Sequence, residues 1–160
     1  MDIDARKKLS SALFTLGSEY LRKGYCATAV DRLQESYGLL PENVKSLTLN
    51  YKLGAAYKRI KDHKRAAGYM GRAADLDKKV IAMQSEAADE FMLAGDFASA
   101  ANYYRQCIEA EPRKLKCYIQ IGDVYRDYLN DGKAAAQWYK TGLETNDVDP
   151  LAGELRKRLE

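Results

Sequence analysis

The chain has 160 residues, 46% of them hydrophobic, and a formal net charge of +3. This length and composition are typical of one soluble domain, and the charge is too small for a chain that binds nucleic acid over a wide surface. No segment approaches the roughly 20 apolar residues that a membrane-spanning helix needs. We therefore expect no insertion into a membrane and, in the absence of a secretory signal at residues 1–8, a cytoplasmic location.

A short motif recurs through the chain at a spacing of 34 to 37 residues. The sequence L-G-x-x-Y occurs at residues 16–20 and 53–57, and looser copies follow at 87–91 and 121–125. Self-similarity with this period is typical of chains that stack helical hairpins. The motif therefore predicts an all-α repeat architecture.

A second motif in each period marks a second helix. A small residue, a larger apolar residue and another small residue follow one another at positions i, i+4 and i+7, which share one face of a helix. The four sets are Ala29, Leu33, Ser36; Ala66, Met70, Ala73; Ala100, Tyr104, Cys107; and Ala135, Tyr139, Gly142. Each period is thus predicted to hold two amphipathic helices.

These four copies in register resemble the tetratricopeptide repeat (TPR) family over about residues 11–147, and Pro41 and Pro112 close two repeats as the family pattern expects. The resemblance implies a right-handed superhelical stack of antiparallel helix pairs, formed by a single domain over residues 1–160. The implied repeats are about 9–42, 46–78, 80–113 and 114–148, followed by a capping helix at about 150–159.

The expected helix boundaries agree with these repeats. Asp62, Asp96 and Asp131 each precede a second helix as potential N-caps, and Gly24 and Gly95 end first helices. The pair Asp149-Pro150 predicts the start of the capping helix. Its leucines, Leu151, Leu155 and Leu159, would cover the end of the stack, and its basic residues, Arg156, Lys157 and Arg158, would face water.

The sequence contains none of the common catalytic or phosphate-binding motifs, and His63 is its only histidine. We therefore expect a protein that is not an enzyme and that has no cofactor and no metal site. Three cysteines, Cys26, Cys107 and Cys117, are an odd number without C-x-x-C spacing. They are predicted to be free thiols that pack between helices.

The candidate binding surface consists of the first-helix residues that remain once the core stripe is removed. The family resemblance implies that such positions line a concave groove for an extended peptide or a partner helix. Phe14, Tyr51, Met92 and Ile119 would be apolar anchors, with a basic half formed by Arg22, Lys58 and Arg59 and an acidic half formed by Asp89, Asp123 and Asp127. The predicted site residues are Phe14, Ser18, Arg22, Tyr51, Lys58, Arg59, Ser85, Asp89, Met92, Ile119, Asp123 and Arg126.

The predicted function is a protein-interaction module or assembly scaffold, and two alternatives stay open. Residues 58–65 hold five basic residues against one acid, which is compatible with binding of nucleic acid. A solvated turn, or the docking of an acidic protein segment, is the more economical interpretation. Self-association through the ends of the stack is the other alternative.

Overall fold

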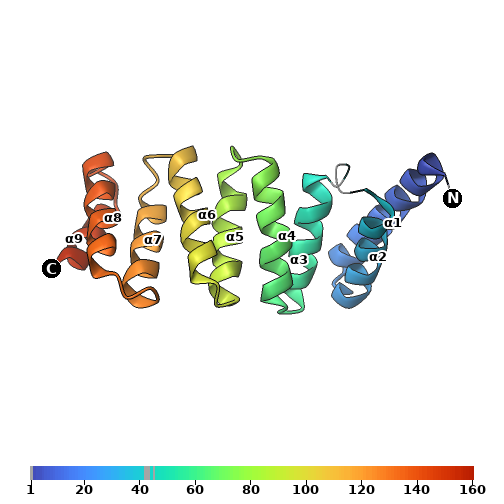
Figure 1. The fold of residues 1–160 in the computed structure, drawn as a ribbon, viewed down its shortest axis with the longest axis horizontal. Helices are drawn as coiled ribbons and strands as arrows, with labels where there is room; N and C mark the ends of the chain where they lie inside the picture. The colour runs from blue at the N-terminus through green and yellow to red at the C-terminus, as the bar shows by residue number, and fades with distance from the viewer. Residues whose placement is uncertain (1, 42–43, 45) are drawn as a thin grey trace. The chain divides into compact units, whose positions relative to one another are not determined.

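The computed structural model describes residues 2–41, 44 and 46–160, and the regular elements within these residues are all α-helices (Figure 1). The predicted all-α helical-repeat class is therefore confirmed. Pairs of helices follow one another along the chain, as the period of the sequence requires. The helices are α1 (Ile3–Lys23), α2 (Cys26–Leu39), α3 (Leu47–Arg59), α4 (His63–Leu76), α5 (Ile81–Leu93), α6 (Phe97–Ala110), α7 (Leu115–Asp127), α8 (Gly132–Thr145) and α9 (Ala152–Leu159).

The chain divides into two compact units, Met1–Asp77 and Lys78–Glu160. In unit 1, α1 pairs with α2 and α3 pairs with α4, and α2 packs against α3. In unit 2, α5 pairs with α6 and α7 with α8, while α9 packs against α8 and touches α7. The assignment of residues 1–160 to a single domain stays a prediction.

Glycines permit the close helix crossings inside the repeats. A Cβ on Gly17 would lie 2.8 Å from Leu33 Cγ, and a Cβ on Gly54 would lie 2.5 Å from Met70 Cγ. These distances are shorter than a van der Waals contact, so a side chain at either position would force the two helices apart. The small residue of the first motif is therefore required because it faces the large residue of the second motif.

The turn inside each hairpin needs one residue in the left-handed region. Gly24 and Gly95 supply it with φ angles of 88° and 78°, and Lys61 and Asn130 occupy the equivalent turns with φ angles of 62° and 53°. Glycine adopts this conformation without a steric penalty, whereas lysine does not. The predicted helix ends at the two glycines are confirmed.

Aspartate caps begin the second helices of three repeats, as predicted. The Asp62 carboxylate accepts a hydrogen bond from the Arg65 N–H at 3.1 Å, and Asp96 and Asp131 cap α6 and α8 in the same way. The capping helix α9 begins at Ala152, slightly later than predicted. Asp149 accepts a hydrogen bond from the Leu151 N–H at 2.8 Å in the turn that precedes it.

The prediction that all three cysteines are free thiols is wrong for two of them. Cys107 on α6 and Cys117 on α7 form a disulfide, and their Cα atoms are 6.4 Å apart. Both cysteines are fully buried, because the core stripes of the two helices face each other inside unit 2. Sequence spacing alone could not reveal this pair, since the ten-residue separation includes the turn between the helices. Cys26 is a free thiol.

Candidate functional site

In unit 1, the predicted site residues lie on the first helices of two successive repeats. Phe14 and Ser18 belong to α1 and are half-buried, and Tyr51 is half-buried on α3. A cavity of about 330 Å³ opens beside Phe14, and we call it the α1–α3 cavity. Its walls are formed by Lys7, Ser10, Ser11, Phe14, Ser36, Leu40, Ser46, Thr48 and Leu49.

The predicted basic half contains residues with different roles. Arg59 donates a hydrogen bond of 2.8 Å to the backbone carbonyl of Leu21, so it caps the last turn of α1. Arg22 is highly exposed and lies 3.9 Å from a Glu19 carboxylate oxygen, a distance at which an exposed ion pair contributes little. Lys58 is exposed on the last turn of α3. Arg22 and Lys58 are thus accessible, whereas Arg59 stabilises the packing of α3 against α1.

Some basic side chains of the turn at residues 58–65 also make contacts inside unit 1. Arg65 lies 3.4 Å from the Asp62 carboxylate, and its guanidinium lies 5.5 Å from the centre of the Tyr57 ring. The Arg59 side chain reaches α1, as described above. At least two of the five cations therefore join elements of the fold, and the free positive charge of this turn is smaller than the sequence indicates.

In unit 2, Asp89 on α5 is bound by neighbouring side chains. The Tyr104 hydroxyl donates a hydrogen bond of 2.6 Å to Asp89 Oδ1, and the Gln120 amide on α7 donates one of 3.2 Å to the same atom. Burial and the adjacent carboxylate together raise the pKa of the Tyr104 phenol well above its usual value. Asp89 therefore links three helices, which limits what it offers to a partner.

Asp123 on α7 occupies the same position in the next repeat and is bound even more completely. It accepts a 2.7 Å hydrogen bond from the Tyr139 hydroxyl and two from Arg158, at 2.8 and 3.0 Å. The expectation that Arg158 faces water is wrong, because α9 turns this residue toward α7. Arg156 and Lys157 are exposed, as predicted. The bidentate contact fixes the capping helix on the first-helix face of the last repeat.

The remaining candidates of unit 2 are less accessible than expected. Ile119 is only 7% exposed, so it belongs to the core in this structure and does not present an open anchor. Met92 and Ser85 are half-buried, and the Ser85 hydroxyl lies 3.5 Å from Cys107 Sγ. Arg126 forms two hydrogen bonds with Asp127, and this contact lowers the pKa of the Asp127 carboxyl.

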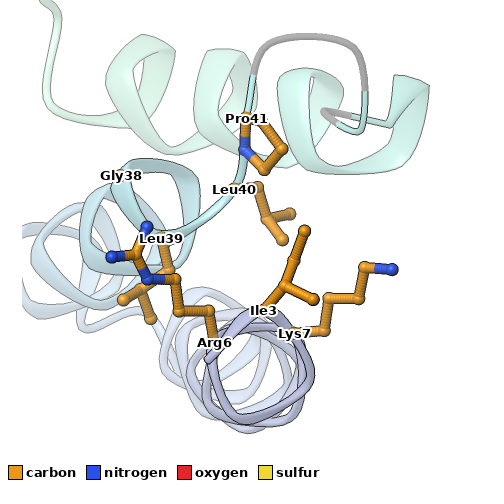
Figure 2. Close-up of a pocket in the computed structure, with 7 residues that line it drawn as sticks. All are labelled: Ile3, Arg6, Lys7, Gly38, Leu39, Leu40 and Pro41. Atoms are coloured by element: carbon orange, nitrogen blue, oxygen red, sulfur yellow. The ribbon is translucent and has the colours of Figure 1, made fainter. Parts of the chain in front are cut away.

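Sequence reasoning missed a second cavity in unit 1, which we call the N-terminal pocket. It has a volume of about 530 Å³ and lies between the start of α1 and the end of α2 (Figure 2). Its lining residues are Ile3, Arg6, Lys7, Gly38, Leu39, Leu40 and Pro41. The exposed basic run at residues 6–8, on a helix that begins before the first motif, was the signal that could have indicated it.

The described part of the chain contains neither a membrane-spanning helix nor a cluster of metal ligands. Among its helices, none combines the length and the apolarity that crossing a bilayer would require. Its histidine, cysteine and carboxylate side chains also form no cluster of three that could hold a metal ion.

Comparisons with known proteins identify the repeat. Residues 84–114 match the family model of the tetratricopeptide repeat, which covers the third predicted repeat. No curated protein matches the chain by sequence.

Solved structures extend this likeness to most of the chain. A crystal structure of MamA is 23% identical, covers 89% of this chain and 85% of its own, and has a TM-score of 0.65. YrrB, described as a TPR protein with an unusual peptide-binding site, is 18% identical with coverages of 92% and 74% and a TM-score of 0.68. A TPR protein from Parabacteroides merdae is 21% identical, with coverages of 96% and 59% and a TM-score of 0.71. Similarity at this level shows the fold, and with the matched repeat it confirms the resemblance inferred from the sequence.

Proposed function

We propose that this tetratricopeptide-repeat protein is a non-catalytic interaction scaffold that binds an extended peptide or a helix of a partner protein on the α1–α3 face of unit 1. The observation that carries the proposal is the α1–α3 cavity, which contains the predicted anchor Phe14. Helical-repeat proteins typically bind partners on surfaces formed by successive repeats. The peptide-binding site named for YrrB, which shares this fold, supports the same class of ligand.

The chemistry of the cavity suits a peptide. Phe14 and Leu40 offer apolar contact, and the Ser11 and Thr48 side chains form no hydrogen bond within the described part of the chain. Hydroxyl groups of this kind can donate to, or accept from, the backbone of an extended segment. An aromatic anchor beside adaptable polar groups is the arrangement that small binding sites commonly use.

The predicted site residues of unit 2 contribute less to the proposed binding surface. Its predicted acidic residues, Asp89 and Asp123, already accept hydrogen bonds from Tyr104 and Tyr139, and Arg158 covers Asp123. A basic partner segment would have to compete with these contacts. We therefore assign the first contact with a partner to unit 1 and treat the acidic positions as part of the fold.

Selection from a random peptide library displayed on phage, with the 160-residue chain as bait, tests the proposal. A fluorescein-labelled peptide made from the enriched sequence should bind the chain, and Phe14→Ala should weaken its binding about tenfold or more because an anchor is truncated. Leu76→Ala is the matched control, because Leu76 is exposed at the far end of α4. If no sequence is enriched, or if both variants bind equally well, the assignment of the α1–α3 face is wrong.

A salt titration separates this function from the alternative of nucleic-acid binding. Binding that neutralises many phosphates weakens steeply as salt rises. A labelled peptide held mainly by apolar contacts should lose little affinity over the same range. Tight, strongly salt-dependent binding of single-stranded RNA that is lost when Lys61 and Lys64 are mutated would favour the alternative.

A further inference from the structure

The first helix extends past the hairpin to which it belongs. α1 has 21 residues, whereas α2 and α3 have 14 and 13. The Ser10 and Ser36 hydroxyls are 2.9 Å apart, and this contact fixes the register of α1 against α2. Because the two helices run in opposite directions, the residues before Ser10 lie along the last turn of α2 and reach beyond its end at Leu39. The N-terminal pocket is the space between these two ends.

The walls of the N-terminal pocket are mostly aliphatic. Ile3 comes from the first turn of α1 and points toward Leu40 and Pro41, while Leu39 lies on the opposite side (Figure 2). Leu40 has extended backbone angles, φ −103° and ψ 140°, so the chain turns away from α2 here. Ile3 is 57% exposed, which leaves an apolar surface open to solvent. The volume is within the range of pockets that bind a ligand group.

Two cations flank this apolar surface, and neither has a carboxylate partner among the described residues. Figure 2 shows Arg6 and Lys7 extending on either side of Ile3. Neither forms an ion pair or a hydrogen bond through its side chain within the described residues, and the described lining contains no carboxylate. Elsewhere in unit 1, Lys23 lies 2.9 Å from the Glu19 carboxylate and is thus neutralised on its own helix.

The C-terminal end of α2 lies near these cations. The last carbonyls of a helix carry a partial negative charge that attracts a cation. In this structure, however, neither Arg6 nor Lys7 donates a hydrogen bond to those carbonyls. Their charge therefore stays available to an external anion.

The N-terminal pocket adjoins the α1–α3 cavity, because Lys7 and Leu40 line both. A peptide that fills one cavity can therefore enter the other without leaving the surface of unit 1. The first cavity offers aliphatic walls with two cations, and the second offers an aromatic ring with hydroxyl groups. These different chemistries at two adjoining positions define a direction for a bound segment.

We propose that the N-terminal pocket holds an aliphatic side chain of a partner peptide, with neighbouring aspartate or glutamate carboxylates bound by Arg6 and Lys7. The peptide then continues across Lys7 and Leu40 into the α1–α3 cavity. This inference rests on the proposed peptide-binding function and specifies the chemistry of the ligand. The preferred partner is an acidic segment, because two unpaired cations repel a basic one.

The same phage library tests this chemistry when selection on the wild-type chain is compared with selection on Arg6→Glu/Lys7→Glu. We expect peptides enriched on the wild type to contain an aliphatic residue next to Asp or Glu. A control variant, Lys133→Glu/Lys140→Glu, makes the same change of charge at exposed positions of α8 in unit 2. The Arg6 and Lys7 substitutions place acidic residues in the first turns of the helix, where they suit the helix dipole, so folding should be retained.

Fluorescence anisotropy with the synthetic wild-type peptide gives the quantitative result. The pocket variant and Ile3→Asp should each weaken binding about tenfold or more, while the control variant stays within about twofold. A peptide in which Lys replaces the acidic residues should bind Arg6→Glu/Lys7→Glu better than it binds the wild type. This reversal requires direct contact and would not arise from a general loss of stability.

Several outcomes would overturn the inference. If Phe14→Ala abolishes binding while the pocket variant and Ile3→Asp have no effect, the peptide-binding function stands and the N-terminal pocket is not part of it. Equal losses from the pocket and control variants would show an unspecific charge effect. If no peptide is enriched but vesicles of phosphatidylserine and phosphatidylcholine bind in a manner that depends on Arg6 and Lys7, the pocket recognises a membrane surface. In that case, both proposals fail.

Discussion

Two glycine-to-alanine substitutions in the second hairpin should have opposite effects on stability. A Cβ on Gly54 would lie 2.5 Å from Met70 Cγ, 3.1 Å from Met70 N and 3.3 Å from Ala66 O. The Met70 side chain can move, but the two backbone atoms can yield only if α3 and α4 separate. Gly68 lies on the same hairpin, inside α4, and a Cβ there would meet no atom within 4 Å. The two positions thus differ in space and not in secondary structure.

The expected magnitudes follow from these contacts. Alanine in a helix interior is more favourable than glycine by about 1 kcal/mol, and this gain applies at both positions. At Gly54 it is offset by overpacking, which costs about 1–3 kcal/mol and is near the upper end where backbone is involved. Gly54→Ala should therefore lower the free energy of unfolding by about 1–2 kcal/mol, and Gly68→Ala should raise it by about 1 kcal/mol.

Urea unfolding followed by far-UV circular dichroism measures both variants under the same conditions. The comparison does not depend on the absolute stability of the chain, because each variant is referred to the wild type. If Gly54→Ala is as stable as Gly68→Ala, the close crossing of α3 and α4 does not exist in solution. The repeat would then need a looser packing than the one described here.

Three further predictions concern a turn, the disulfide and the capping helix. Lys61 has a φ angle of 62°, in the left-handed region that glycine adopts more easily. Lys61→Gly should therefore raise the melting temperature and the free energy of unfolding, the latter by about 0.5–1 kcal/mol. An unchanged or lower melting temperature would argue against the left-handed turn. Alkylation of the denatured chain without reductant should modify one thiol, as intact mass will show. Replacing Cys107 and Cys117 by serine should lower the free energy of unfolding by about 2–3 kcal/mol through loss of a ten-residue loop constraint. Three modified thiols would show that the disulfide does not form. Arg158→Gln should lower the free energy of unfolding by only about 1 kcal/mol, because the contact with Asp123 is partly exposed. It should also speed hydrogen exchange in residues 152–159 but not in α6.

The repeat architecture was predictable because its signals are local and repeated. Gly54 and Met70 each belong to a motif that recurs four times, and the contact between them explains both motifs. Caps such as Asp62 depend only on the residues that follow them. Each of these features lies within one hairpin, so the residues of one repeat are sufficient to predict it.

The candidate site was less predictable because exposure depends on contacts between repeats and with α9. Asp89 and Asp123 have the spacing of surface residues on their own helices, yet Gln120 and Arg158 reach them from elsewhere in unit 2. The disulfide was hard to predict for the same reason, because it joins two core positions that face each other across a turn. The disulfide also bears on the predicted cellular location, since disulfides are uncommon in most cytosolic proteins. The cytoplasmic location therefore stays a prediction, and the disulfide weighs against it.

The hydrogen bonds of the charged side chains favour unit 1 over unit 2 as the proposed binding surface. Carboxylates on first helices of unit 2 accept hydrogen bonds from tyrosines of second helices, as Asp123 does from Tyr139. The equivalent position in the first repeat is Ser18, whose hydroxyl forms no side-chain hydrogen bond within the described residues. A first-helix position without such an internal hydrogen bond can take part in contacts with another molecule without breaking the fold. Arg6, Lys7 and both cavities described above lie on unit 1, and this is where we propose that a partner binds.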